Sequence, residues 1–376
     1  MKTVNIGIIG GGLMGKEAAS AIARWFVFNN VTVQPKLVAI ADLNANILDW
    51  YRQIPTVKLL TTNYKEILAM ADVDVIYAAL PHQLHLSIYQ DIIASGKDLL
   101  AEKPFGINLQ AANQIAALAA KANVFVRCSS EMPFLPGAQR LIKEIKESDF
   151  GDIIEVNAGF LHASDMDPQK KINWKRQNEF CGEIGVMGDL GMHVLHIPLR
   201  MGWMPASVYA QLQKIITKRP NEKGELVEAD TWNNALLNTW VNKDGKEFPM
   251  KLEMKRLAPG ETNTWYIEVL GTKAGFRYST KDTKTFWEYK NADTQTWSRI
   301  DLGFDFAFPT ITGKIFEAGF PDCFMQMIAA FLMEREGQLQ QNLGCVTPQE
   351  AVSSHQLFAA ALLSHKKNTV EKLAIQ

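Results

Sequence analysis

Two polar side chains near the middle of the sequence have the types and spacing needed for proton transfer. Asp189 and His193 stand four residues apart in the segment GDLGMH (188–193), so on a helix they share one face. A carboxylate at that position can orient the imidazole, and an imidazole titrates near neutral pH. The pair is therefore a candidate acid–base centre. The alternative for His193 is a histidine buried in the core with its hydrogen bonds satisfied.

A lysine in the first third of the chain could stabilise negative charge. Lys103 lies in the segment AEKP (101–104), directly after an expected strand at 98–101. In an open α/β sheet the carboxyl ends of the strands form the edge where ligands bind. An ammonium group there would stabilise a developing alkoxide. Lys103 is therefore a candidate site residue, with an ordinary surface lysine as the alternative.

A glycine-rich segment near the N-terminus fits a dinucleotide-binding turn. The residues GGGLMG (10–15) match G-x-G-x-x-G directly after an expected strand (4–9) and before a helical pattern. Gly10 would permit the tight turn, Gly12 would let the backbone approach a pyrophosphate, and Gly15 would let the helix pack closely on the strand. The phosphates would then lie at the N-terminus of the helix. The alternative is a glycine-rich turn that binds nothing.

An acidic residue after the second expected strand (37–41) bears on the choice of nucleotide. Asp42 lies farther from Gly15 than the roughly 20 residues that usually separate these positions, and an extended first helix and loop would account for the excess. Its carboxylate can accept hydrogen bonds from a ribose 2′-hydroxyl and would repel a 2′-phosphate. No arginine stands beside it in the sequence, so NAD is favoured over NADP. The alternative is that Asp42 only caps a helix over 43–51.

These motifs, apart from the acid–base pair, belong to a stretch in which expected strands alternate with expected helices. Helices are expected at 83–95 and 109–121, and a sixth strand is expected at 124–128. Such alternation implies right-handed crossovers and a doubly wound parallel sheet. We therefore expect one dinucleotide-binding α/β domain over residues 1–128.

The remaining residues, 129–376, have a different pattern. A helix is expected at 136–147, and from about residue 206 the pattern is mostly strands, with Asp244-Gly245 as a hairpin signal between two of them. Helices are expected again at 324–336 and 348–365. We therefore expect a second, α+β domain for substrate binding and oligomerisation. Its large, mostly antiparallel open sheet would have one face solvated or covered by a partner.

Composition excludes several classes of protein. Of the 376 residues 47% are hydrophobic and 21% are charged, and a formal net charge of −1 indicates neither a nucleic-acid-binding surface nor an acidic tail. No segment reaches the roughly 18 uninterrupted apolar residues typical of a membrane span. The 4 cysteines form no CxxC pair and are expected to be reduced thiols. We expect a cytoplasmic protein with no nucleic-acid or membrane partner.

Taken in order, the motifs resemble the glucose–fructose oxidoreductase / inositol dehydrogenase (Gfo/Idh/MocA) family. The resemblance depends on GGGLMG (10–15), Asp42, LPHQLH (80–85), AEKPF (101–105) and GDLGMH (188–193), which are spread over the first half of the chain. It implies a Rossmann domain followed by a second domain with a large open sheet. It also implies homo-oligomers, dimers or tetramers, that form through that sheet.

The resemblance also assigns roles residue by residue. Lys103 would lie beside the nicotinamide and the substrate hydroxyl, and His193 would be the general acid/base with Asp189 supporting it. Oxidation of a carbinol requires such a base, because the hydroxyl proton leaves while a hydride leaves the same carbon. The expected cofactor site comprises Gly10, Gly12, Leu13, Met14, Gly15, Asp42, Pro81, His85, Glu102 and Lys103.

The sequence departs from the family pattern at two histidines. His82 follows Pro81 where the family often has Asn, and His196 stands three residues after His193 where the family often has Asp. These changes leave the proton relay intact and alter the details of the substrate pocket. Asp189, His193 and His196 could share a helix face and hold a metal, but no further ligand is evident nearby in the sequence, so no metal is expected.

A basic segment (170–176) before the acid–base pair contributes to the expected substrate site. Trp174 could stack on a sugar ring, and Lys175 or Arg176 could pair with a hydroxyl, carboxylate or sulfate group of the substrate. The alternative is a solvated basic loop with Trp174 buried beneath it. The expected substrate residues are thus Lys103, Trp174, Lys175, Arg176 and His193.

Three kinds of function remain open at this point. The first is an oxidoreductase that moves hydride between NAD and a carbinol carbon of a sugar, polyol or sugar acid. The second is a hydrolase or lyase that retains NAD and acts on a glycoside by transient oxidation. The third is a non-catalytic NAD-binding regulator, against which the presence of Lys103, Asp189 and His193 argues. Net reduction of added NAD during turnover would separate the first from the second.

Overall fold

The computed structural model describes residues 1–292 and 294–373. The chain divides into two compact units. The first comprises Met1–Gly106, Gln110–Leu135 and Asp305–Ala351, and the second comprises Ile107–Leu109, Pro136–Phe304 and the described part of Val352–Gln376. The sequence analysis placed a single boundary between residues 128 and 129. The structure instead groups Asp305–Ala351 with the first unit.

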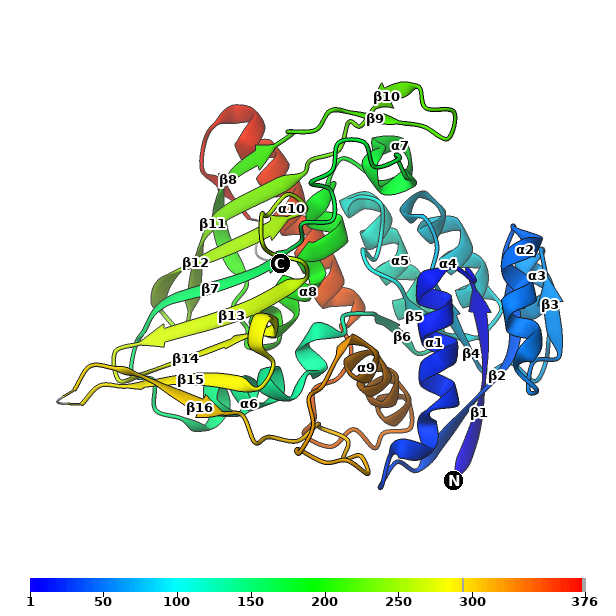
Figure 1. The fold of residues 1–376 in the computed structure, drawn as a ribbon, viewed down its shortest axis with the longest axis horizontal. Coiled ribbons are helices and arrows are strands. Elements are labelled where there is room, and N and C mark those ends of the chain that lie inside the picture. The colour runs from blue at the N-terminus through cyan, green and yellow to red at the C-terminus, as the bar shows by residue number, and fades with distance from the viewer. Residues whose placement is uncertain (293, 374–376) are drawn as a thin grey trace. The chain divides into compact units, whose positions relative to one another are not determined.

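A six-stranded parallel sheet forms the centre of the first unit (Figure 1). The strand order is β3-β2-β1-β4-β5-β6, so the order reverses at β1, and ligands of open α/β sheets bind at such a reversal. The doubly wound sheet expected from the sequence is therefore confirmed. The strands are β1 (Lys2–Ile9), β2 (Val33–Ala41), β3 (Leu59–Thr61), β4 (Val75–Ala78), β5 (Asp98–Ala101) and β6 (Val126–Cys128).

The helix after the glycine turn is shorter than the sequence suggested. It ends at Ala23, and a 3-10 turn (Trp25–Val27) follows, in which Nε1 of Trp25 donates to the carbonyl of Val33 at 2.7 Å. Strand β2 begins at Val33 rather than at residue 37, so a turn and a longer strand account for the distance between Gly15 and Asp42. The helices and 3-10 turns of this part are α1 (Leu13–Ala23), η1 (Trp25–Val27), α2 (Ala45–Leu48), η2 (Asp49–Gln53), α3 (Tyr64–Leu68), η3 (His82–Leu84), α4 (His85–Ala94), α5 (Leu109–Lys121) and η4 (Met132–Phe134).

Helix α9 (Phe320–Arg335) explains why a late segment of the chain belongs to the first unit. It packs against α1, and an ion pair joins Arg24, which follows α1, to Asp322 in α9. The backbone N–H of Ile311 also donates to the carbonyl of Val27 at 3.0 Å. Arg24 and Asp322 are 298 residues apart, so no local sequence pattern could reveal this packing.

A nine-stranded sheet of order β16-β15-β14-β13-β7-β12-β11-β8-β17 forms the second unit (Figure 1). Of the described strand pairs in this sheet, only β7 with β12 is parallel, so the large and mostly antiparallel sheet is confirmed. Asp244 and Gly245 have φ of 54° and 79° and join β11 to β12 in a hairpin, as their sequence indicated. The strands are β7 (Ile153–Leu161), β8 (Pro205–Gln213), β11 (Asn234–Lys243), β12 (Lys246–Lys255), β13 (Thr264–Gly271), β14 (Ala274–Ser279), β15 (Thr285–Lys290), β16 (Trp297–Asp301) and β17 (Glu371–Lys372).

A separate two-stranded sheet, β9 (Lys218–Pro220) with β10 (Leu226–Glu228), was not expected from the sequence. Each strand has three residues, too few for an alternating pattern to be recognised. The preceding strand of the large sheet, β8, ends at Gln213.

Helices pack against one face of the large sheet. Helix α8 contacts β7, β11, β12 and β13, and α6 contacts β14. A Cβ atom at Gly191 of α8 would lie 2.5 Å from Cζ of Phe358, so the absence of a side chain there lets α10 approach α8. The helices and 3-10 turns of this part are α6 (Pro136–Glu147), η5 (Trp174–Arg176), α7 (Asn178–Cys181), α8 (Val186–Arg200), η6 (Thr280–Asp282) and α10 (Pro348–Lys367).

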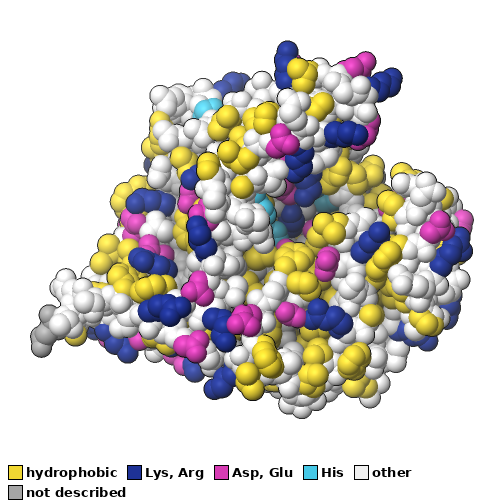
Figure 2. All heavy atoms as spheres, in the orientation of Figure 1, with side chains coloured by type: hydrophobic (Ala, Val, Ile, Leu, Met, Phe, Trp, Pro, Cys, Tyr) yellow, Lys and Arg dark blue, Asp and Glu magenta, His cyan; other side chains and the backbone are white. Residues whose placement is uncertain are grey.

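The other face of the sheet carries exposed side chains. Along β11, Leu237 and Val241 are buried on the helix-covered side, whereas Asn238, Trp240 and Asn242 alternate with them and are exposed. On the face of the molecule shown in Figure 2, basic and acidic side chains are interspersed. Among the described residues, no helix is long and apolar enough to cross a membrane.

Candidate functional site

The glycine turn joins β1 to α1 at the reversal of strand order in the first unit. Gly10 has φ of +97°, and a Cβ atom there would lie 2.0 Å from the carbonyl oxygen of Ala79, directly after β4. A Cβ atom at Gly15 would lie 2.3 Å from the carbonyl oxygen of Gly10. At Gly12, by contrast, a Cβ atom would meet none of the described atoms within 4 Å. The turn is therefore tightly packed on its inner side and open at Gly12, where a phosphate could approach.

Helix α1 directs its first backbone N–H groups toward this opening. Its N-cap, Gly12, has no side chain that could accept hydrogen bonds from them. The first N–H that bonds within the helix is that of Lys16, to the carbonyl of Gly12 at 3.0 Å. The N–H groups of Leu13, Met14 and Gly15 precede it and lie at the positive end of the helix dipole. The helix start therefore suits a pyrophosphate.

Asp42 lies beside the same turn. Its Oδ2 accepts a hydrogen bond from the N–H of Gly11 and its Oδ1 accepts one from the N–H of Asn44, both at 2.8 Å. The cap of α2 is Asn44, whose side chain accepts from the N–H of Asn46. Each carboxylate oxygen of Asp42 has a further lone pair. A ribose at the glycine turn could therefore donate its hydroxyl protons to Asp42.

Three further side chains, those of Tyr51, Leu13 and Leu43, contact the glycine turn or flank it and Asp42 in the sequence. The hydroxyl of Tyr51 donates to the carbonyl of Gly11 at 3.0 Å. Burial and the charge of Asp42 raise the pKa of Tyr51, so the hydroxyl stays protonated. Leu13 and Leu43, which flank the turn and Asp42 in the sequence, have 76% and 84% of their surface exposed. Large apolar side chains with this exposure could cover the apolar parts of a nucleotide.

His85 connects the loops that follow β4 and β5. Its Nδ1 lies 2.8 Å from the carbonyl oxygen of Pro104 and its Nε2 lies 3.0 Å from that of Leu80. The ring stacks on Tyr89 with their centroids 4.7 Å apart. Burial lowers the pKa of His85 to about 4, so the ring is neutral at pH 7 and can donate to only one of the two carbonyls. The sequence analysis placed His85 among the cofactor contacts, and the structure gives it the separate task of holding two site loops together.

Glu102 and Tyr77 fix the backbone at Lys103. Glu102 is buried and accepts a hydrogen bond from the hydroxyl of Tyr77 at 2.6 Å. The N–H of Lys103 lies 3.2 Å from Oε2 of Glu102 and 3.3 Å from Oγ of Ser129. Burial and the Glu102 carboxylate raise the pKa of Tyr77, so this hydroxyl remains a donor. Pro81 and Lys103 are half-buried, whereas His82 is buried, with its ring centroid 5.4 Å from that of His85.

In the second unit, helix α8 contains the predicted acid–base pair. Asp189 and His193 lie one turn apart in this helix and are 7% and 2% exposed. Nε1 of Trp265 donates to the carbonyl of His193 at 2.9 Å, and the rings of Phe160 and His193 meet edge-on with their centroids 5.4 Å apart. His196, one turn farther on, is fully buried. The shared helix expected for the pair is therefore present, and the position of His193 is fixed by β7 and β13.

The carboxylate of Asp189 binds two cations. Nζ of Lys175 lies 2.9 Å from Oδ1, while Nε and Nη2 of Arg256 both lie 3.2 Å from Oδ2. Lys175 was expected near the substrate, and the structure places its ammonium group beside the carboxylate of the acid–base pair. Its side chain is 36% exposed, whereas that of Arg256 is 1% exposed.

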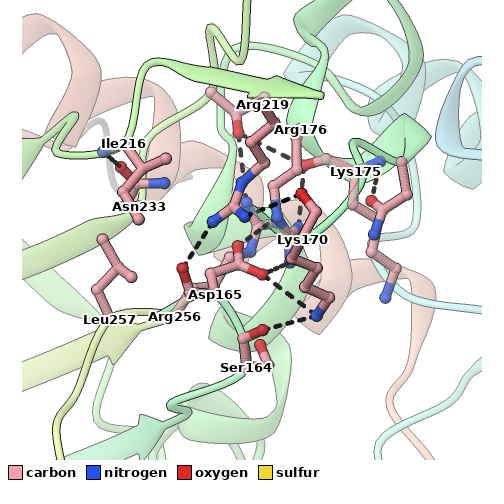
Figure 3. Close-up of polar contacts among 12 residues, drawn as sticks. Ser164, Asp165, Lys170, Lys175, Arg176, Ile216, Arg219, Asn233, Arg256 and Leu257 are labelled. Atoms are coloured by element: carbon pink, nitrogen blue, oxygen red, sulfur yellow. Dashed lines mark hydrogen bonds and ion pairs between the residues drawn. The ribbon is translucent and has the colours of Figure 1, made fainter. Parts of the chain in front are cut away.

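Arg176 differs from its expected role. It is buried and ion-paired with Asp165, which is 1% exposed, and its Nη2 donates to Oδ1 of Asp165 at 2.8 Å (Figure 3). Its guanidinium is therefore part of the interior of the unit, and we do not include it in the proposed substrate site. Trp174 is half-buried, with the ammonium of Lys175 5.6 Å from its ring centroid, so part of this residue is exposed to solvent.

Three residues of this region were missed by the sequence analysis. Arg219 is buried and donates to the carbonyls of Asp165, Asp167 and Lys170, so it anchors the loop that leads to Lys175 (Figure 3). His162, at the end of β7, lies with its ring centroid 4.6 Å from that of Phe160. The third is Arg256, and the sequence contains a pattern that could have marked it as an inward-facing residue.

That pattern is the alternation of apolar residues along β12. Met250, Leu252 and Met254 occupy alternate positions and are buried, and Arg256 is next in the series. An arginine at an inward position predicts a buried ionic partner, although the pattern cannot say which one.

Among the described residues, no group of three or more His, Cys, Asp or Glu side chains is arranged to hold a metal ion.

Comparisons with known protein families agree with the two units. Residues 4–130 match the family described as "Oxidoreductase family, NAD-binding Rossmann fold", and residues 138–277 match the "GFO/IDH/MocA C-terminal domain". The chain is 25% identical over 303 residues to a levoglucosan dehydrogenase of Pseudarthrobacter phenanthrenivorans, a match that covers 75% of each protein. It is 27% identical over 128 residues to a trans-1,2-dihydrobenzene-1,2-diol dehydrogenase of Xenopus laevis, which is 34% of this chain and 39% of that one.

Solved structures show the same fold. A levoglucosan dehydrogenase in complex with NADH and L-sorbose matches with a TM-score of 0.88 and 19% identity, covering 100% of both chains. An NAD-binding oxidoreductase from Klebsiella pneumoniae matches with a TM-score of 0.86 and 22% identity, again over 100% of both chains. With both of its domains matched in order and the motifs of the glycine turn, the AEKP segment and α8 in place, the chain belongs to the Gfo/Idh/MocA family of NAD-binding oxidoreductases.

Proposed function

We propose that this protein transfers hydride between NAD and a carbinol carbon of a sugar, polyol or sugar acid. The observation that carries the proposal is the pair Asp189 and His193 on one helix, with the ammonium of Lys175 on the carboxylate, in a chain of an NAD-binding oxidoreductase family. An alcohol cannot lose a hydride without also losing its hydroxyl proton, and this helix provides a base for that proton. The similar levoglucosan dehydrogenase acts, by its name, on a sugar derivative.

NAD rather than NADP is the proposed cofactor. The carboxylate of Asp42 is held at the glycine turn by the N–H groups of Gly11 and Asn44. It can accept hydrogen bonds from ribose hydroxyls, whereas a 2′-phosphate at the same place would put two negative charges side by side. Gly12 and the start of α1 would hold the pyrophosphate.

We assign the chemical roles as follows. Bound NAD supplies a carbon that accepts the hydride. His193 accepts the hydroxyl proton of the substrate, Lys103 stabilises the alkoxide as that proton leaves, and Asp189 supports His193 from one helical turn away. In the reverse direction His193 returns the proton to the same oxygen. Trp174 and Lys175 would bind the remainder of the substrate.

The test is net reduction of NAD with a panel of sugars, polyols and sugar acids. We expect at least one member to be oxidised with NADH formed in equal amount, and NADP to be used much less well. If glycosides are cleaved while the NAD content stays constant, the protein is instead a hydrolase or lyase that uses transient oxidation. If no member of the panel is oxidised or cleaved, the proposal fails.

We further propose a homo-oligomer, a dimer or tetramer, that forms through the open face of the nine-stranded sheet. This face carries Trp240, 52% exposed, next to Ser207 of β8 and Pro249 of β12. An indole exposed on a sheet face is typical of a surface that a partner covers. Light scattering at micromolar concentration tests this, and a monomer would contradict it.

The 4 cysteines are buried free thiols, which supports the expected cytoplasmic location.

A further inference from the structure

The glycine turn contains one glycine, Gly11, that the pattern G-x-G-x-x-G does not require. It does not have a positive φ, so backbone conformation does not explain it. A Cβ atom at Gly11 would lie 3.0 Å from Cγ2 of Ile47 and 3.1 Å from Cε2 of Tyr51, whereas carbon atoms in ordinary contact lie about 3.5–4.0 Å apart. A Cβ atom at Gly15 would lie 2.9 Å from the hydroxyl oxygen of Tyr51. The phenol of Tyr51 therefore occupies the space beside two glycines of the turn.

Tyr51 belongs to η2 and is fully buried. Its hydroxyl donates to the carbonyl of Gly11 at 3.0 Å, and its own carbonyl accepts from the N–H of Ile54 at 3.1 Å. The neighbouring Trp50 meets its ring edge-on with the centroids 4.8 Å apart. Nζ of Lys16 in α1 lies 5.3 Å from the ring centroid of Trp50. These contacts connect η2 to α1 and leave the phenol little freedom to move.

Both polar backbone groups of Gly11 have partners. Its N–H donates to Oδ2 of Asp42 at 2.8 Å, and its carbonyl accepts from the hydroxyl of Tyr51. Burial and the charge of Asp42 raise the pKa of Tyr51, so the hydroxyl is a donor at neutral pH. A carboxylate and a phenol from different parts of the chain therefore hold the backbone of Gly11 in one orientation.

The orientation of Gly11 determines that of the next N–H group. The carbonyl of Gly11 and the N–H of Gly12 belong to one trans peptide group, and in a planar trans peptide these two bonds point in opposite directions. Because the carbonyl points to the buried hydroxyl of Tyr51, the N–H of Gly12 points away from it. Among the described residues this N–H has no hydrogen-bond acceptor. It lies on the open side of the turn, where a Cβ atom at Gly12 would meet none of the described atoms within 4 Å.

We propose that Tyr51 is a positioning residue of the nucleotide site, which directs the N–H of Gly12 at the pyrophosphate through the carbonyl of Gly11. The inference rests on the proposed binding of NAD at the glycine turn and adds a residue that is too deeply buried to touch the nucleotide. If the peptide group rotated, it would present its carbonyl oxygen to the phosphates, and the two would repel each other. The hydrogen bond from Tyr51 opposes this rotation, so the turn presents a donor before NAD arrives.

Tyr51→Phe tests the proposal, because it keeps the ring beside Gly11 and Gly15 and removes only the hydroxyl. Calorimetry would measure NAD and ADP-ribose, which contain the pyrophosphate, and displacement of NADH would measure adenosine, which contains only adenine and ribose. We expect the variant to bind NAD and ADP-ribose about fivefold more weakly or worse, since a hydrogen bond to a charged group is weakened. Its affinity for adenosine should stay within about twofold of the wild type, because the hydrogen bonds that hold Asp42 remain.

A merely structural role of Tyr51 predicts a different pattern. A turn that loosens as a whole would also lose affinity for adenosine, because the N–H of Gly11 holds the carboxylate of Asp42. Tyr64→Phe is the matched control: the hydroxyl of Tyr64 donates to Oδ2 of Asp91 at 2.6 Å and so joins α3 to α4 in the same unit. Its removal should leave all three affinities unchanged. Thermal unfolding of both variants checks that the fold is retained.

The wild-type protein gives an answer even if Tyr51→Phe does not fold. In NMR spectra of protein with isotope-labelled glycine, the amide signal of Gly12, identified by its absence in Gly12→Ala, should move downfield when NAD is added. The N–H then gains an acceptor.

Three results would overturn the proposal. They are a Gly12 signal that NAD does not move, an NAD affinity of Tyr51→Phe equal to that of the wild type, and an equal loss of affinity for NAD and adenosine. If NAD binds and one of these results is found, only this inference fails. If neither NAD nor NADP binds the wild type, the proposed function fails with it. Binding of NAD as expected without oxidation of any sugar would uphold this inference and count against the proposed function.

Discussion

At the scale of single residues, the carboxylate of Asp42 does two things at once. It accepts the backbone N–H of Gly11 and so fixes the glycine turn, and it presents further lone pairs beside that turn. The N–H of Asn44 holds its second oxygen in place. The group is therefore set before a nucleotide arrives, which reduces the conformational entropy that binding must remove.

Asp42→Ser should weaken NAD binding by about tenfold or more, because the hydrogen bonds to a charged acceptor are lost. It should also reduce the discrimination against NADP, since no negative charge then opposes the 2′-phosphate. Calorimetry with NAD and NADP measures both effects. Asp49→Ser is the control, because Asp49 is 67% exposed and pairs only at the surface with Arg52. An unchanged NAD affinity in Asp42→Ser would leave Asp42 a purely structural role.

His85 should make stability depend on pH. In the folded chain burial lowers its pKa to about 4, against 6.5 in the unfolded chain. Between these values the unfolded chain binds a proton that the folded chain does not, so this group destabilises the fold as pH falls below about 6.5. The loss between about pH 7 and pH 5 should be on the order of 2 kcal/mol.

His85→Asn removes this titration while its amide can still donate to the carbonyl of Pro104 in place of Nδ1. We therefore expect the variant to be less stable at pH 7 but to lose less free energy of unfolding on acidification than the wild type. Urea denaturation at several pH values measures the difference. Parallel pH profiles for the two proteins would show that His85 does not titrate as its burial implies.

At the scale of elements, the glycines of the turn have separable tasks. Gly10 and Gly15 are required by packing, because a Cβ at either would lie within 2.3 Å of a backbone oxygen. Gly12 has φ of −67°, which any residue can adopt, and open space around its missing Cβ. Packing alone does not require glycine at position 12.

Gly12→Ala should therefore fold normally, with a free energy of unfolding within about 0.5 kcal/mol of the wild type. Its NAD affinity should fall by about tenfold or more, because the new methyl group lies where the pyrophosphate approaches the backbone. Gly10→Ala provides the contrast, since its positive φ and the oxygen of Ala79 should lower stability by a few kcal/mol. Calorimetry and urea denaturation together separate the two cases. If Gly12→Ala binds NAD as the wild type does, the phosphates do not approach at Gly12.

The sequence could reveal those parts of the site whose residues lie close together along the chain, but not those whose partners are distant in sequence. The glycine turn, Asp42 and the helix of Asp189 and His193 follow from patterns within about ten residues, and the structure contains each of them. The partners of Asp189 come from η5 and from the end of β12. Neither Lys175 nor Arg256 is marked by local spacing as a neighbour of that carboxylate, because the pairing depends on how the sheet and the helix pack.

At the scale of the whole molecule, the two units contain different parts of the proposed chemistry. The glycine turn, Asp42 and Lys103 belong to the first unit, and Asp189 with His193 belongs to the second. Neither unit contains both the nucleotide-binding turn and the acid–base pair. Segment Asp305–Ala351 returns to the first unit, so the chain passes between the units more than once. The proposed function therefore requires residues of both units, although each has its own sheet and buried core.

Combined substitution of Lys103 and His193 tests whether the two units act on one substrate. Lys103→Met keeps much of the bulk of the stem and removes the ammonium, and His193→Asn keeps a polar group that cannot carry a proton near neutral pH. Each should lower turnover by about 100-fold or more while NAD affinity stays close to that of the wild type, because neither belongs to the phosphate or ribose site.

If both groups stabilise the same transition state, the double variant should be scarcely slower than either single one, because groups that act as a unit are not additive. Two effects that multiply would instead indicate independent roles. The His193 variant should also lose one limb of the pH–rate profile, because its side chain can no longer accept and return a proton. Calorimetry with NAD and steady-state rates on one substrate supply all the measurements. Turnover near that of the wild type in His193→Asn would exclude His193 as the base.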